Sequence, residues 1–225
     1  MRFHQNLPRR RLFYQQLIGP TTPTAFQCAE LAATLQEESE LLECSDGSYV
    51  EDGGLCYHGW LFASEIRQSI VEGSGPGHGH PDLLSSYRAE LCGLLAFLYL
   101  VQRVCSHHGV SSGTLHLYCD NKSALAKTVS SGPRGIMPFF SADYDLIALI
   151  RLQTTLLPIS VVGEWVKGHY TGDHREYKHD LNNRADRLAT SAPKTMPTSF
   201  VTKPNSGSPS WLLGSSSQPQ WSYQL

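Results

Sequence analysis

Four acidic residues, each in a short run of small or polar neighbours, are the part of this chain best suited to chemistry. They are Asp46 in Cys-Ser-Asp-Gly-Ser-Tyr, Glu90 in Tyr-Arg-Ala-Glu-Leu, Asp120 in Leu-Tyr-Cys-Asp-Asn-Lys and Asp186 in Asn-Asn-Arg-Ala-Asp-Arg. Carboxylate oxygens are hard ligands of the kind that Mg²⁺ takes, together with water and phosphate oxygens. Four carboxylates brought together would repel one another without a cation, so we predict that they hold divalent cations.

Each acid on its own also has an ordinary explanation. Asp46 in Asp-Gly-Ser suits a turn, and Asp120 suits the cap of a following helix. Glu90 and Asp186 suit the solvent side of helices. Together they suit the hydrolysis of a phosphodiester, in which one cation activates water and a second stabilises the leaving oxygen.

The elements that would position these acids form an α/β arrangement, with a mixed sheet flanked by helices. Strands are expected over residues 41–50 and 55–63, joined by Glu51-Asp52-Gly53-Gly54, which has hairpin chemistry. The Gly- and Pro-rich residues 72–82 are predicted to form a loop. The expected order after this loop is a long helix capped by Ser85 or Ser86, a strand over 115–120, a helix over 122–130, a loop over 134–141, a helix over 143–156, a strand over 159–167 and a last helix over 182–190.

Three parts of the chain are expected. Residues 1–40 form an N-terminal linker or docking segment, in which a helix over 25–38 carries a narrow apolar stripe of Phe26, Leu31 and Leu35. Residues 41–192 form the main domain. Residues 193–225, rich in Ser, Pro and Gly, are predicted to be a disordered tail, whose few aromatic side chains are either a short binding motif or stray apolar residues.

Composition indicates which partners and which cellular compartment to expect for the protein. The chain of 225 residues has 40% hydrophobic residues and a formal net charge of -2, so no global basic field indicates a nucleic-acid partner, and any such affinity should be modest and sensitive to salt. Its six cysteines include no Cys-x-x-Cys pair and are predicted to be free thiols in a reducing compartment. No segment suggests a signal peptide or a membrane span. We therefore expect an intracellular protein, in the cytoplasm or the nucleus, that does not bind membranes.

The ordered set Asp-Gly-Ser, Arg-Ala-Glu-Leu, Cys-Asp-Asn and Asn-x-x-x-Asp, with Trp165-Val166-Lys167-Gly168-His169 before the last acid, resembles ribonuclease H. More narrowly, it resembles the ribonuclease H domain attached to reverse transcriptases of eukaryotic retroelements. The resemblance runs from about Leu41 to Ala192. It implies a ribonuclease H-like fold, with a five-stranded mixed sheet in the order 3-2-1-4-5 whose first three strands are antiparallel.

The resemblance also implies endonucleolytic cleavage of the RNA strand of an RNA/DNA hybrid. It implies two Mg²⁺ ions, which Mn²⁺ can replace, and a monomeric domain whose partners are the hybrid and a reverse transcriptase polymerase domain. The residues that it implicates are the metal ligands Asp46, Glu90, Asp120 and Asp186, then His169 for proton transfer or product release, Asn182 for the attacking water or the substrate, and Ser86 and Arg88 for contacts in the minor groove.

The sequence departs from the family pattern in two places. The stretch from His169 to Asp186 is longer than the compact bacterial loop. The stretch from about Ser130 to Asp143 lacks the basic helical protrusion with which cellular forms grip the hybrid. A polymerase domain or another partner would then have to supply this grip.

Other classes fit the residues less well. A proofreading exonuclease has its first Asp and Glu two positions apart on one strand, whereas 44 positions separate Asp46 from Glu90. An integrase usually has a Glu on a late helix as its last acid. Strand alternation predicts that Trp165 is buried rather than a stacking platform. The alternative from another class is a non-catalytic module that kept the fold to bind or dock on nucleic acid.

Overall fold

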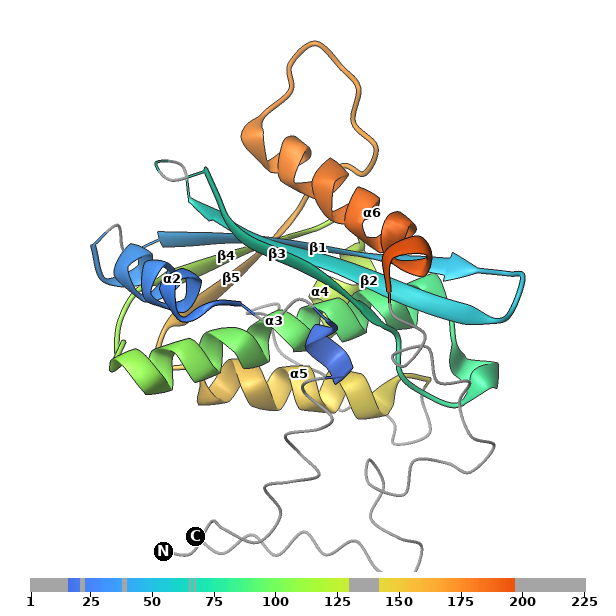
Figure 1. Cartoon of the computed structure of the whole chain (residues 1–225), viewed down its shortest axis with the longest axis horizontal. Coiled ribbons are helices and arrows are strands. Elements are labelled where there is room, and N and C mark those ends of the chain that lie inside the picture. Colours follow the sequence, from blue (N-terminus) through green and yellow to red (C-terminus); the bar gives the residue numbers. More distant parts are fainter. Residues whose placement is uncertain are drawn as a thin grey trace, which may run out of the picture.

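A five-stranded sheet in the order β3-β2-β1-β4-β5 forms the centre of the computed structural model, which describes residues 16–20, 23–37, 40–64, 66, 68–129 and 142–196 (Figure 1). Its strands are β1 (Glu40–Val50), β2 (Leu55–Ser64), β3 (Gln68–Pro76), β4 (Thr114–Cys119) and β5 (Ser160–Trp165). β1, β2 and β3 pair in antiparallel fashion, whereas β1 with β4 and β4 with β5 are parallel. The predicted mixed sheet, its order and its antiparallel first three strands are confirmed.

Helices cover the two faces of the sheet unequally (Figure 1). One face carries α3 (Ser86–His108), with α4 (Lys122–Thr128) and α5 (Tyr144–Leu156) beside it, and α2 (Ala25–Glu37) packs against α3 and the sheet. The other face carries α6 (Tyr177–Thr195), which contacts β1 and β2. A 3₁₀ turn, η1 (Pro81–Leu83), precedes α3.

α3 is the central helix of the larger core. Ser85 caps its N-terminus by accepting a hydrogen bond from the Arg88 N–H at 3.1 Å, and Gly109 ends it in the left-handed conformation with φ of 69°. α3 is long and apolar enough to cross a membrane, but most of its apolar window is buried inside the protein. Its apolarity is thus explained by its place between the sheet and α5.

The predicted loop over 72–82 is wrong in its first half, because β3 continues to Pro76. Its glycines make room for neighbouring groups. A Cβ added at Gly73 would collide with the Trp60 ring, and one added at Gly75 would collide with the Leu17 carbonyl and the His58 ring. Glycine in this strand therefore marks close packing.

Two helices differ from their predicted form. In α2, Leu31 and Leu35 lie in the core, but Phe26 is 72% exposed, so its predicted place in the apolar stripe is wrong. α6 begins five residues earlier than predicted, because Glu176 and His179 form a reciprocal capping box at its start. The loop predicted over 134–141 and the tail after Met196 lie outside the described residues.

Candidate metal centre

Asp46 and Asp120 come from neighbouring parallel strands. The last residues that pair between β1 and β4 are Cys44 and Tyr118, and Asp46 and Asp120 follow each of these by two positions. Because side chains alternate along a strand, both carboxylates lie on the α6 side of the sheet. Asp46 lies within β1, not in the turn that was its ordinary alternative, and accepts a hydrogen bond from the Gly47 N–H at 2.7 Å.

Gly47 lets α3 approach this part of the sheet. A Cβ added at Gly47 would collide with the backbone nitrogen of Glu90 and the backbone oxygen of Ser86. Because no side chain intervenes, the first turns of α3 rest directly on the β1 backbone. This contact brings Glu90 close to Asp46.

Asp120 does not serve as the helix cap that was its ordinary alternative. Asn121 caps α4, its Oδ1 accepting hydrogen bonds from Ser123 N at 3.0 Å and Ala124 N at 3.1 Å. The Asp120 carboxylate therefore stays available for other contacts. One ligand atom each from Glu90, Cys119 and Asp120 lie within 4.8 Å of one another.

The electrostatics of Asp46 and Glu90 indicate crowding by negative charge. Burial, and then the charge of Asp120, raises the pKa of Asp46 to about 7, and Asp186 adds to this effect. Burial, followed by the charges of Asp120 and Asp46, raises the pKa of Glu90 to about 8. Glu90 Oε2 is buried and has no hydrogen-bond partner among the described residues. A divalent cation would relieve both conditions.

Asp186 on α6 and His169 in the loop after β5 form the more open side of the centre. His169 Nδ1 lies 3.7 Å from Asp186 Oδ2, and their side chains are 78% and 26% exposed. His169 has a φ of 47°, in the left-handed region that few non-glycine residues adopt. The loop is anchored on α6, where Asn183 Nδ2 donates to the Tyr170 carbonyl at 3.2 Å and the Tyr170 ring stacks on His179.

Asn182 lies beneath the acids. It is 1% exposed, and its Oδ1 accepts a weak hydrogen bond from Cys44 Sγ at 3.5 Å. This contact joins α6 to β1 and leaves the amide no access to solvent. The position does not support the predicted contact of Asn182 with the attacking water or the substrate.

Arg88 is not at the surface, so its predicted position beside the minor groove is wrong. Its side chain is 1% exposed and donates to Asp143 at 2.8 Å, to Asp145 at 2.6 Å and, through Nε, to the His78 carbonyl at 2.5 Å. These contacts tie α3 to the start of α5 and to the turn before η1. Ser86 is exposed at the start of α3, and its contact with substrate stays a prediction.

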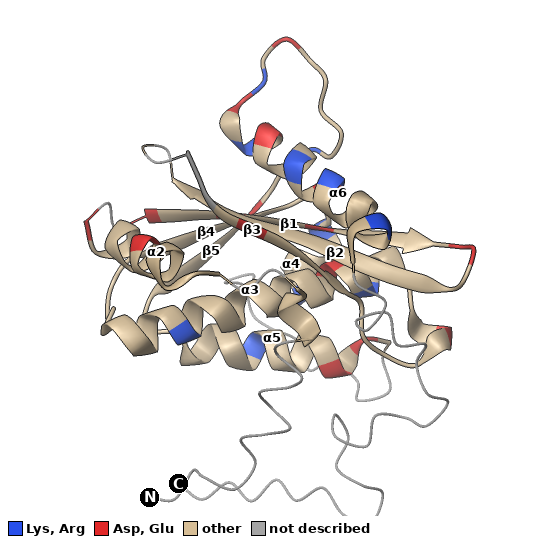
Figure 2. Cartoon of the chain, viewed as in Figure 1, with Lys and Arg blue, Asp and Glu red and all other residues tan. Residues whose placement is uncertain are grey.

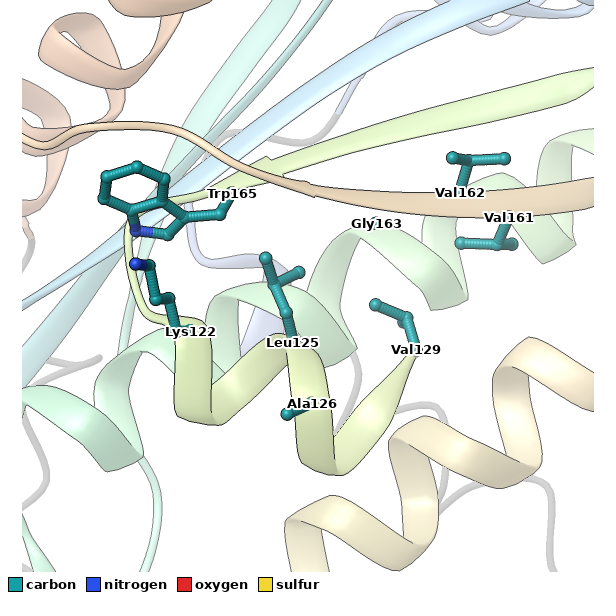
Figure 3. A pocket seen from close by; sticks show the side chains of 8 residues that line it. All are labelled: Lys122, Leu125, Ala126, Val129, Val161, Val162, Gly163 and Trp165. Carbon is teal, nitrogen blue, oxygen red and sulfur yellow. The ribbon is translucent and has the colours of Figure 1, made fainter. Parts of the chain in front are cut away.

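Trp165 and Lys122 are neighbours of the acids that the sequence did not indicate. Trp165 is 43% exposed, against the prediction of burial, and its Nε1 donates to the Asp120 carbonyl at 2.9 Å. Lys122 Nζ lies 4.1 Å from the centroid of the Trp165 ring. Both line a groove of about 370 Å³ between α4 and β5, together with Leu125, Ala126, Val129, Val161, Val162 and Gly163 (Figure 3).

Several Lys and Arg positions lie along the α6 ribbon (Figure 2). Lys178 pairs with Glu164 at 2.6 Å, and Arg184 pairs with Glu72 at 2.5 Å. Arg187 is exposed next to Asp186. Lys178 and Arg184 are thus paired with carboxylates, and Arg187 is an exposed cation on α6 that a phosphate could contact.

No protein-family model matches the chain, and no curated protein matches it in sequence. Solved structures with a similar trace include an N-terminal RNase H domain from Mycobacterium tuberculosis fused to maltose binding protein, with 18% identity, coverage of 69% of this chain and 94% of that one, and a TM-score of 0.47. RNase H1 from the archaeon Halobacterium salinarum has 19% identity, coverage of 69% and 98%, and a TM-score of 0.46. LC11-RNase H1, solved in complex with an RNA/DNA hybrid, has 14% identity, coverage of 72% and 99%, and a TM-score of 0.48. At such low sequence identity, these structures assign no activity to this chain. The ribonuclease H-like fold rests on the strand order and pairing.

Proposed function

We propose that this chain hydrolyses the RNA strand of RNA/DNA hybrids with the help of two Mg²⁺ ions. The observation that carries the proposal is the meeting of four carboxylates from β1, α3, the end of β4 and α6. Asp120 and Asp186 act electrostatically on Asp46, and Asp120 and Asp46 act on Glu90. Burial and neighbouring carboxylates that raise the pKa values of Asp46 and Glu90 are costly unless a function needs them.

The donor set fits hard divalent cations. All four groups offer carboxylate oxygens, and the buried Glu90 Oε2 lacks any other partner among the described residues. Asp120 and Asp186 face partly open space, which leaves coordination positions for water and for phosphate oxygens. Magnesium, when bound, supplies an activated water and charge stabilisation at the leaving oxygen.

The chain's own residues then orient the substrate and move protons. His169 lies beside Asp186 on an exposed loop, where it can take a proton from, or give one to, a group leaving the centre. Lys122 on α4 follows Asp120 by two positions, Arg187 on α6 follows Asp186 directly, and both would contact phosphates. A grip by α6 and α4 would in part replace the basic protrusion that the sequence lacks.

The motif order of the sequence supports a narrower proposal, that the chain belongs with or derives from a retroelement reverse transcriptase. A polymerase domain would then add affinity for the hybrid. This proposal predicts that the isolated chain binds hybrid modestly and loses affinity steeply as salt increases.

Cleavage of a labelled hybrid tests the function. The purified chain is incubated with Mg²⁺ and a hybrid labelled at the RNA 5′ end, and Asp120→Asn, purified identically, controls for contaminating nucleases. We expect cleavage of the RNA strand by the wild type alone, and none of single-stranded RNA or duplex DNA. Binding of the hybrid without cleavage, by a folded protein saturated with Mg²⁺ or Mn²⁺, would instead support the non-catalytic module.

A further inference from the structure

We propose that Cys119 joins Glu90 and Asp120 in a site for a soft divalent cation such as Zn²⁺, overlapping the magnesium centre. One ligand atom from each of the three side chains lies within 4.8 Å of the other two. A thiolate prefers Zn²⁺ or Cd²⁺, whereas Mg²⁺ prefers oxygen alone. The same end of the sheet would then hold either kind of ion, through different ligands.

The position of Cys119 suits a ligand. It is the last residue of β4 and is fully buried, on the side of the sheet that α3 covers. Its Sγ accepts a hydrogen bond from the Asn121 N–H at 3.3 Å. Contacts of this kind hold a ligating sulfur in place.

The surroundings of Glu90 also indicate a bound cation at this place. It is 8% exposed, and its Oε2 is buried without a hydrogen-bond partner among the described residues. The carboxylate of Glu90 is therefore held next to Cys119 with a lone pair unused. Asp120, which is partly exposed, would complete three protein ligands and leave the fourth tetrahedral position to water.

Binding of a doubly charged soft cation releases one proton and offsets most of the negative charge of the three ligands. The thiol gives its proton to solvent when the cation–sulfur bond forms, so no oxidant or reductant is needed. The three ligands then carry three negative charges against two positive ones. If the proposed function holds, occupancy of this site removes Glu90 and Asp120 from the magnesium centre, so Zn²⁺ inhibits cleavage in competition with Mg²⁺.

The other cysteines provide a matched control. Cys44, on the adjacent strand, faces the opposite side of the sheet and bonds Asn182. Cys28 on α2 is the one cysteine that is not buried, so its thiol is the most accessible to non-specific metal binding. Cys28→Ser and Cys119→Ser therefore separate a surface thiol from the proposed ligand.

Cadmium titration of the full, metal-free chain tests the site without any nuclease assay. The readout is the ultraviolet charge-transfer band of a cadmium–thiolate bond. We expect wild type and Cys28→Ser to show a saturable band of equal size that Cys119→Ser lacks. Glu90→Gln, which keeps every thiol, should weaken the cadmium affinity at least about tenfold. Excess Mg²⁺ should lower the apparent cadmium affinity of the wild type.

A band of unchanged size and affinity in folded Cys119→Ser would overturn the proposal. If Cys119→Ser fails to fold, the Glu90→Gln titration decides alone, and an unchanged affinity there overturns it equally. The two proposals fail separately. A cadmium band in a protein that does not cleave hybrid leaves this site standing, and hybrid cleavage without the band leaves only the proposed function standing.

Discussion

The two walls of the candidate metal centre are built in opposite ways. In the wall formed by β1 and the start of α3, Asp46 and Glu90 are 7% and 8% exposed, and α3 rests on the β1 backbone at Gly47. In the wall formed by α6 and the loop before it, Asp186 is partly exposed, and the side chain of its neighbour His169 is 78% exposed. One wall is fixed by packing before any cation binds, and the other can adjust to the cation and the substrate.

The two walls differ in how strongly their carboxylates repel one another. Electrostatic interactions are strong in the buried wall, where water cannot screen them, and weak in the open wall. This is why the pKa values of Asp46 and Glu90 rise to about 7 and about 8. Loss of a charge from the buried wall should therefore affect cations more than the same loss from the open wall.

The largest expected effect is a difference between Glu90→Gln and Asp186→Asn in hybrid cleavage. We expect Glu90→Gln to lower kcat at least about 1000-fold, equivalent to ~4 kcal/mol of transition-state stabilisation. Asp186→Asn should lower it about tenfold to a hundredfold, because water can replace an exposed ligand. Single-turnover rates across a range of Mg²⁺ concentrations measure both. Equal losses would remove the distinction between the walls.

The next effect concerns the buried ion pairs of Arg88, which join the start of α3 to α5. Arg88→Met should lower the free energy of unfolding by about 3–5 kcal/mol, because it leaves Asp143 and Asp145 without their buried cation. Arg184→Met, which breaks the half-exposed pair with Glu72, should cost at most about 1 kcal/mol. Urea unfolding in the absence of metal compares the two variants. A loss as small for Arg88→Met as for Arg184→Met would contradict the supporting role of the buried ion pairs.

Stability should also depend on pH through the buried wall. Asp46 and Glu90 have folded pKa values of about 7 and about 8, above their ordinary values of 3.8 and 4.5. The folded chain thus holds these protons more tightly than the unfolded chain, so metal-free stability falls as pH rises from about 4 to 8. The fall is at most about 1.4 kcal/mol per pH unit for each group.

Urea titrations with a chelator, at several pH values in this window, measure the fall. Glu43, fully buried in β1 with a pKa raised by burial, contributes in the same direction and is not expected to respond to Mg²⁺. Saturating Mg²⁺ and Asp46→Asn should each flatten the profile. A profile that neither of them changes would show that the acids of the centre are not its source.

The smallest expected effect lies in the open wall. His169→Ala should slow cleavage about tenfold to a hundredfold, the range of general acid–base contributions, and leave the unfolding free energy unchanged because the side chain is exposed. His107→Ala, at the exposed far end of α3, is the matched control and should change neither the cleavage rate nor the unfolding free energy. A pH–rate profile with the same shape in His169→Ala as in the wild type would argue against proton transfer by this residue.

Local signals in the sequence predicted the elements whose causes are local. The long helix followed from its apolar spacing and its Ser85 cap, and the β1–β2 hairpin from the turn chemistry of residues 51–54. β3 was partly missed because the role of its glycines depends on Trp60 and His58, which belong to another strand. Strand alternation misplaced Trp165 because β5 pairs only with β4 and forms the edge of the sheet.

In the candidate site too, local sequence signals predicted some features, and others depend on residues far apart in the chain. The four acids stood out because each motif is compact, and the pKa values of Asp46 and Glu90 agree with their expected proximity. The buried partners of Arg88 lie 55 and 57 residues further along the chain, beyond the reach of any local pattern. The spacing of Arg88 and Glu90 alone cannot reveal that both charged side chains are buried.

The electrostatic interaction between Asp46 and Asp186 spans 140 positions of the chain, from the first strand of the sheet to the last helix. β4 and β5 must also pair in parallel, through crossovers that close long stretches of chain, before α6 can dock. Contacts between such distant residues form late, because their loop-closure entropy is lost before their packing is gained. A nascent or partly folded chain would thus carry all four carboxylates and no assembled centre, and hydrolytic competence would arise only with the finished sheet.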